Sequence, residues 1–97
     1  AGLAITLSIL SLLLDKKVKR DVAMTGEINL QGNITAIGGL ELKIIGGIKG
    51  GVKTFLFPKE NENDFNKVKE RYHEDVFKNI KFISVETLAD AMEYVFI

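Results

Sequence analysis

The chain has 97 residues, of which 46% are hydrophobic, and this is enough for a single small domain (residues 1–97) with its own core. Its 13 basic and 13 acidic side chains cancel, so net charge provides no long-range attraction to nucleic acid or to an anionic membrane. The absence of cysteine excludes a disulfide framework and a thiolate metal site in these residues, and we expect no metal ion or cofactor to be held by them.

The first fourteen residues carry no charge. As a helix they would extend about 21 Å, which is short of the roughly 30 Å hydrocarbon core of a bilayer. No basic region precedes the run and no small-residue cleavage site follows it, so a signal peptide is not favoured either. We predict a buried helix with more than one face covered. Ser8 and Ser11 are poor candidates for a nucleophile, because a serine inside a helix usually bonds back to a preceding carbonyl.

A β-hairpin is predicted next. Residues 22–25 and 27–30 have strand character, residues 31–33 supply turn-forming side chains, and residues 34–37 form the returning arm. Gly26 interrupts the first strand pattern, which indicates a bulge or a close approach of two backbone segments. A distorted strand of this kind is a common place from which a functional side chain is presented.

Residues 38–48 are predicted to form a helix that opens on two glycines. Its core face carries three apolar residues at helical spacing: Leu40, Ile44 and Ile48. Lys43 lies one residue off that stripe, and Gly46 and Gly47 are its neighbours on the helix surface. Such small neighbours leave room for another backbone segment or a substrate to approach the lysine amine, although close packing explains them equally well.

The remaining elements alternate between strand and helix. We predict a buried strand over residues 54–57, a short helix over residues 61–68 and a strand over residues 80–83. Ser84 is then predicted to be the N-cap of a final helix over residues 85–95. The pattern indicates an α/β (α+β) fold in which helices pack on a small mixed sheet that includes a β-hairpin.

Two segments of this chain resemble a known protein family. Residues 21–28 read Asp-Val-Ala-Met-Thr-Gly-Glu-Ile, and residues 37–43 read Ile-Gly-Gly-Leu-Glu-Leu-Lys. Together they are similar to the proteolytic domain of the Lon family of ATP-dependent serine proteases. The resemblance extends through residues 50–54 and 58–61 to the last helix, and it implies a Lon proteolytic-domain-like fold.

The resemblance also implies roles for individual residues. In the family, the threonine of the first motif steadies a catalytic lysine in the second, and Thr25 and Lys43 occupy these positions. The nucleophilic serine of the family directly precedes an Ala-Gly pair, and this chain begins with Ala1 and Gly2. The serine is therefore expected just upstream, with backbone N–H groups at Ala1 and Gly2 as oxyanion donors, and the segment alone is expected to be inactive.

The expected chemistry is that of a Ser-Lys dyad. A lysine accepts a proton from a serine hydroxyl only when its amine is neutral, which at neutral pH requires burial or a nearby positive dipole. We expect the helix over residues 38–48 to bury the amine of Lys43 against the sheet, so that Lys43 is the general base and Thr25 orients it. Two positions depart from the family pattern: Glu41 replaces a common lysine and Ala36 replaces a common proline.

The resemblance implies an ATP-dependent endopeptidase that degrades unfolded or regulatory proteins. Its expected partners are protein substrates, further copies of the chain in a homo-hexamer and an upstream ATPase domain that uses ATP and Mg²⁺, with no membrane. The family works in the bacterial cytoplasm and the mitochondrial matrix. The alternative is an inactive Lon-like binding and assembly domain of the kind attached to RadA, although such domains do not keep the threonine and lysine that Thr25 and Lys43 match.

Overall fold

A computed structural model describes residues 2–97 of the chain. The elements in chain order are α1 (Leu3–Leu14), β1 (Val22–Met24), β2 (Glu27–Ile28), β3 (Ile34–Thr35), α2 (Leu40–Lys49), β4 (Thr54–Pro58), the 3₁₀ turn η1 (Lys59–Asn61), α3 (Glu62–Arg71), the 3₁₀ turn η2 (Glu74–Phe77), β5 (Lys81–Val85) and α4 (Leu88–Val95). The predicted α+β class, with helices on a small sheet and a hairpin, is confirmed.

The strands form a parallel sheet and a separate hairpin. β4 lies in the middle of the order β1-β4-β5, and both of its neighbours pair with it in parallel. β2 and β3 pair antiparallel, as the sequence predicted. A central strand covered on both faces needs apolar residues at successive positions, which explains the run Phe55-Leu56-Phe57 in β4.

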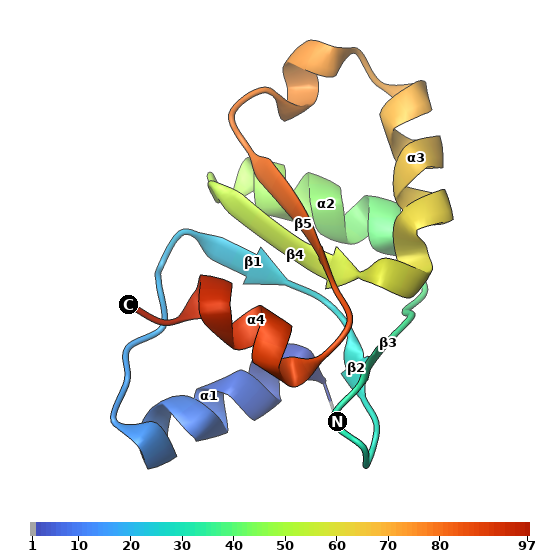
Figure 1. The fold of residues 1–97 in the computed structure, drawn as a ribbon. Helices are drawn as coiled ribbons and strands as arrows, with labels where there is room; N and C mark the ends of the chain where they lie inside the picture. Colours follow the sequence, from blue (N-terminus) through green and yellow to red (C-terminus); the bar gives the residue numbers. More distant parts are fainter. Residues whose placement is uncertain (1) are drawn as a thin grey trace.

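Helices cover both faces of the parallel sheet, with α1 and α4 on one side and α2 and α3 on the other (Figure 1). Alternate residues of β4 point to opposite faces. Leu56 packs in a core with residues of α1 and α4, whereas Phe55 and Phe57 pack with residues of α2 and α3. The sheet therefore separates two apolar cores, and both help to place the segments that surround the site described below.

Helix α1 differs from the prediction in its burial. Leu3 and Leu7 are buried against the sheet and α4. The opposite face is apolar but open to solvent, with Ile5 64%, Ile9 54% and Leu12 83% exposed. The expectation that more than one face is covered was wrong for the described residues, because they pack on only one side of this helix. No helix within residues 2–97 combines the length and apolarity needed to cross a bilayer.

The last helix begins later than predicted. Ser84 belongs to β5, where it pairs with Phe57, so it does not cap a helix. The N-cap is Thr87, whose side chain accepts a hydrogen bond from the N–H of Asp90, while the Asp90 carboxylate accepts from the N–H of Thr87. This reciprocal capping box satisfies two backbone donors and starts α4 at Leu88.

Candidate active site

A hollow of about 190 Å³ lies at the N-terminal end of α1. Gly2 borders it from the start of α1, Thr25 from the connection between β1 and β2, and Lys43 from α2. Ile37, which precedes α2, completes one wall. The structure thus brings three of the four sequence-predicted site residues to one place, although they are far apart in the sequence. The fourth, Ala1, lies outside the described residues.

Thr25 is held by the end of the parallel sheet. Its N–H donates to the carbonyl oxygen of Leu56 at 3.0 Å, which continues the β1–β4 pairing beyond Met24. The residue is 6% exposed, so its side chain is confined by its surroundings. The backbone then departs from strand geometry at Gly26, whose φ is +147°.

Gly26 is required by close packing as well as by its backbone angle. A Cβ atom at this position would lie 2.7 Å from Cγ2 of Ile34 and 3.3 Å from Cγ of Pro58. The carbonyl oxygen of Gly26 accepts a hydrogen bond of 2.9 Å from the N–H of Leu3. The close backbone approach that the sequence indicated at this glycine is therefore confirmed, and its partner is the first turn of α1.

The first turn of α1 presents backbone donors to the hollow. Gly2 is the N-cap and provides no side-chain cap, and no acidic residue occupies the first turn. The N–H of Leu3 is used by Gly26, whereas the N–H groups of Ala4 and Ile5 have no helical acceptor within residues 2–97, as is usual at a helix N-terminus. Both residues line the hollow. Such groups, at the positive end of the helix dipole, favour developing negative charge.

Lys43 extends from the first turns of α2. Its N–H donates to the carbonyl oxygen of Gly39 at 3.3 Å, and Gly39 itself has a φ of +71°. Leu40, Ile44 and Gly47 are the buried residues of this helix, as the apolar stripe predicted for Leu40 and Ile44. Lys43 lies beside that stripe and is exposed. The expected burial of its side chain was wrong for the described residues, because the sheet covers only the face that Ile44 occupies.

The predicted contact between the two side chains is not made here. Within residues 2–97, neither the Thr25 hydroxyl nor the Lys43 amine takes part in a side-chain hydrogen bond or an ion pair. Lys43 is thus open to solvent and to a ligand that enters the hollow. The arrangement holds a primary amine, a hydroxyl and helix N–H donors around one space, which are the groups that acyl transfer requires apart from a nucleophile.

The two serines of α1 do not offer that nucleophile. The Ser8 hydroxyl donates to the carbonyl oxygen of Ala4 at 2.9 Å, as predicted for a serine inside a helix. Ser11 differs from this prediction, since its hydroxyl bonds forward to the carbonyl oxygen of Lys16 beyond the end of the helix. Neither residue lines the hollow that holds Thr25 and Lys43.

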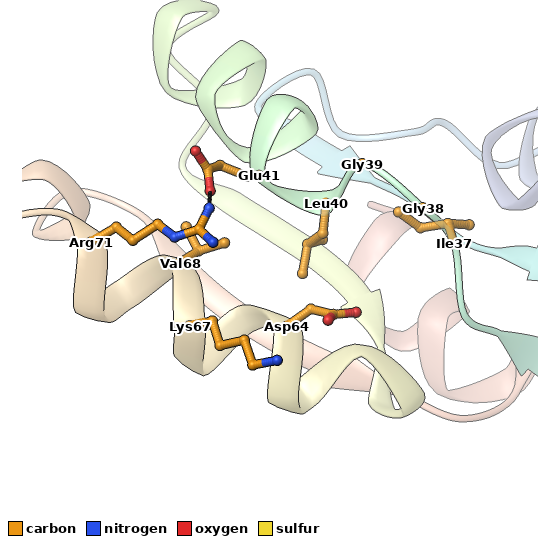
Figure 2. Close-up of a pocket in the computed structure, with 9 residues that line it drawn as sticks. All are labelled: Ile37, Gly38, Gly39, Leu40, Glu41, Asp64, Lys67, Val68 and Arg71. Carbon is orange, nitrogen blue, oxygen red and sulfur yellow. Dashed lines mark hydrogen bonds and ion pairs between the residues drawn. The ribbon is translucent and has the colours of Figure 1, made fainter.

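A second hollow of about 320 Å³ lies where α2 begins against α3. Figure 2 shows Glu41 of α2 meeting Arg71 of α3 across this space. The second oxygen of the same carboxylate accepts a hydrogen bond of 2.9 Å from the Tyr72 hydroxyl. This bond is the main reason that the pKa of Tyr72 is raised above its ordinary value. Glu41, a departure from the family pattern, therefore has two partners on the neighbouring element.

Two residues near the site were not identified from the sequence. Ile37 lines the first hollow, and Asn61 is 1% exposed with its side chain bonded to the backbone of Ile37. Asn61 stands in a Pro-Lys-Glu-Asn run whose family resemblance was the only available signal. Nothing in that run predicts that an asparagine at a helix start is buried against a segment 24 residues earlier.

Comparisons with known proteins find relatives that match almost the whole of this chain. A family model described as "Lon protease (S16) C-terminal proteolytic domain" matches residues 1–97. The chain is 44% identical to the Lon protease of Campylobacter jejuni over 97% of its length and 12% of that protein. It is 44% identical to the Lon protease of Clostridium acetobutylicum over 96% of the chain and 11% of that protein. It is 40% identical to a mitochondrial Lon protease homolog of Scheffersomyces stipitis over 99% of the chain and 8% of that protein.

Proposed function

The chain belongs to the family of Lon C-terminal proteolytic domains, and from this premise we propose that it supplies the general base of a serine peptidase. In this proposal Lys43 is the base, Thr25 orients its amine, and a serine that directly precedes Ala1 in the full-length protein is the nucleophile. The observation that carries the proposal is that Gly2, Thr25 and Lys43 border one hollow at the start of α1.

The geometry supports a defined sequence of proton transfers. In this proposal the serine lies just before the start of α1, where Gly2 and Lys43 border the hollow. The neutral amine of Lys43 takes the hydroxyl proton as the serine oxygen attacks a peptide carbonyl carbon. The ammonium then returns that proton to the leaving amine as the peptide C–N bond breaks. Water then attacks the ester carbonyl while Lys43 accepts its proton, and the ammonium returns that proton to the serine oxygen as the ester C–O bond breaks.

Charge that develops on the carbonyl oxygen is stabilised at the helix terminus. The N–H groups at Ala1 and Gly2 are the proposed donors, and the positive end of α1 adds a favourable field. Thr25 limits where the amine can lie through a hydrogen bond that forms when the site is occupied. Lys43 is exposed in the described residues, so in this proposal a bound substrate and the remainder of the protein cover its amine.

The chain spans about 12% or less of the length of the relatives reported above. We therefore propose the properties of the whole protein from the family alone. These are a homo-hexamer, an upstream ATPase domain that uses ATP and Mg²⁺, and degradation of unfolded or regulatory proteins. The relatives are bacterial and mitochondrial proteins, which supports an intracellular site of action in the bacterial cytoplasm or the mitochondrial matrix.

The test is cleavage of a fluorogenic peptide by the full-length protein with and without Lys43→Ala. Lys49→Ala is the matched control, because Lys49 is an exposed lysine on the same helix that does not border the hollow. Loss of cleavage in Lys43→Ala alone, with an unchanged circular dichroism spectrum, is the expected result. A folded and assembled protein that cleaves nothing in any form would favour the inactive binding platform, which the names of the relatives do not favour.

A further inference from the structure

The segment that leads into α2 is held from outside by the turn η1. The Ala36 N–H donates to a carboxylate oxygen of Glu60 at 2.8 Å. The Ile37 N–H donates to Oδ1 of Asn61 at 3.0 Å, and Nδ2 of Asn61 donates back to the Ile37 carbonyl oxygen at 3.0 Å. Residues that are 24 positions apart in the sequence are therefore joined by three hydrogen bonds to the backbone of two successive residues.

Asn61 is built into this position with its polar atoms satisfied. It is 1% exposed, and the second proton of its amide donates to the carboxylate of Asp64 at 2.8 Å. The two partner groups on Ile37 and the Asp64 carboxylate together determine which way the amide faces. A buried amide with this many partners is costly to replace by an apolar side chain, since the Ile37 backbone groups would lose theirs.

The segment held by Asn61 is part of the candidate active site. Ile37 lines the hollow that Thr25 and Lys43 border. After Ile37 the chain turns through Gly39, and the backbone N–H of Lys43 donates to the Gly39 carbonyl oxygen. A change in the position of Ile37 therefore moves the wall of the hollow and the start of the helix that carries the proposed base.

Glu60 holds the residue where this chain departs from its family. Proline is the residue that the resemblance leads us to expect at the position of Ala36, and proline fixes its own φ and carries no N–H. Ala36 has a freer backbone and one donor, and Glu60 accepts that donor. The carboxylate thus restrains a peptide unit that proline would restrain covalently.

We propose that Asn61 is a positioning residue for the proteolytic reaction, and that it works together with Glu60 by holding the Ala36–Ile37 backbone against the hollow. This inference rests on the proposed function of Lys43. Asn61 does not line the hollow, so it acts through Ile37 and the start of α2.

The experiment compares Asn61→Leu with Asn66→Leu in the full-length protein. Asn66 is an exposed asparagine on α3 and controls for the substitution itself. A misplacement near 1 Å costs on the order of a hundredfold in rate. We therefore expect kcat for the fluorogenic peptide to fall about ten- to hundredfold in Asn61→Leu, with KM changing less than about threefold. The reduction in kcat should persist at a lower temperature at which circular dichroism shows that the variant is folded. Cooling can refold a destabilised variant, but it does not return Ile37 to its original position.

A second set of variants decides the matter if Asn61→Leu does not fold. Glu60 is exposed, so Glu60→Ala should fold, and it should lower kcat in the Ala36 protein. In an Ala36→Pro background, Glu60→Ala should have no effect on kcat, because proline lacks the N–H that donates to the Glu60 carboxylate. An equal effect of Glu60→Ala in both backgrounds, or an unchanged kcat in folded Asn61→Leu, would overturn the inference. Failure of the unsubstituted protein to cleave would instead overturn the proposed function, and this inference with it.

Discussion

The carbonyl oxygen of Gly26 and the N–H of Leu3 form a hydrogen bond of 2.9 Å, which joins the residue after Thr25 to the first turn of α1. This bond connects the two halves of the candidate site directly. The backbone that carries Thr25 is therefore fixed relative to the N–H donors of α1. Lys43, in contrast, belongs to a separate element, α2. The precision of the site depends on how tightly these three segments pack.

Gly26→Ala should destabilise the fold. The new methyl group would meet Ile34 at 2.7 Å, and the backbone angle of +147° is unfavourable for any side chain. Overpacking of this kind typically costs about 1–3 kcal/mol, which urea unfolding would measure as a lower midpoint.

Gly46→Ala provides the control for that substitution. Gly46 lies inside α2, and a Cβ at this position meets nothing within 4 Å. Alanine should therefore stabilise the protein by about 0.5–1 kcal/mol through the backbone entropy of glycine. Equal urea midpoints for the two variants would contradict the packing that we describe at Gly26.

Thr25→Val should reduce peptide cleavage while the fold is kept. Valine matches threonine in shape and suits a position that is 6% exposed, but it removes the hydroxyl proposed to orient the amine of Lys43. We expect kcat to fall about ten- to hundredfold in the full-length protein. Thr25→Ser retains the hydroxyl and should lose less, so a serine variant as weak as the valine variant would argue against an orienting role.

Glu41→Ala should lower the pKa of Tyr72. The hydrogen bond to the Glu41 carboxylate is the largest cause of the raised pKa, and Arg71 opposes it. In a segment of residues 1–97 that carries Tyr94→Phe, only Tyr72 contributes tyrosinate absorbance, since these residues contain two tyrosines. The titration midpoint should then move down in Glu41→Ala and stay in place in Glu70→Ala, which alters an exposed glutamate of α3.

The same raised pKa has a consequence for stability at high pH. Because the folded state holds the Tyr72 proton more tightly than the unfolded state, this group contributes stability below its ordinary pKa. That contribution is lost as the pH rises through the raised, folded pKa. The difference in unfolding free energy between the parent protein and Glu41→Ala should therefore shrink at strongly alkaline pH.

The capping box of α4 should lose part of its stabilising effect in acid. Hydrogen bonds from the N–H groups of Glu86 and Thr87 hold the pKa of Asp90 below its ordinary value. A lowered folded pKa means that the contribution is present above the unfolded pKa and disappears as the pH falls through the folded one. The stability difference between the parent protein and Asp90→Asn should thus narrow below about pH 4.

Glu93→Gln is the matched control for the acid series. Glu93 is exposed on the same helix, and within residues 2–97 it accepts no backbone N–H. The difference in unfolding free energy between the parent protein and Glu93→Gln should change less with pH. If the difference in unfolding free energy between the parent protein and Asp90→Asn stays constant from neutral to strongly acidic pH, the Asp90 carboxylate does not accept the backbone hydrogen bonds described above.

Local patterns predicted most elements but not every boundary. The run Phe55-Leu56-Phe57 indicates a buried strand in any context, and β4 occupies it. The start of α4 was misjudged because Ser84 and Thr87 are both good N-cap residues. Pairing of Ser84 with Phe57 extends β5, so the helix can start only after the next cap-forming residue, Thr87.

The sequence by itself determined the family, the α+β class and the identity of the candidate residues Thr25 and Lys43. The α+β class follows from periodicity, whereas the family and the two candidate residues follow from the resemblance of residues 21–28 and 37–43 to a known family; all of these signals are local in the chain. The tertiary structure alone decided that Gly2, Thr25 and Lys43 share one hollow, that Lys43 is exposed, and that Asn61 holds Ile37. Burial and long-range hydrogen bonds depend on which elements pack against each other. A local sequence pattern does not show which distant element a given face will contact.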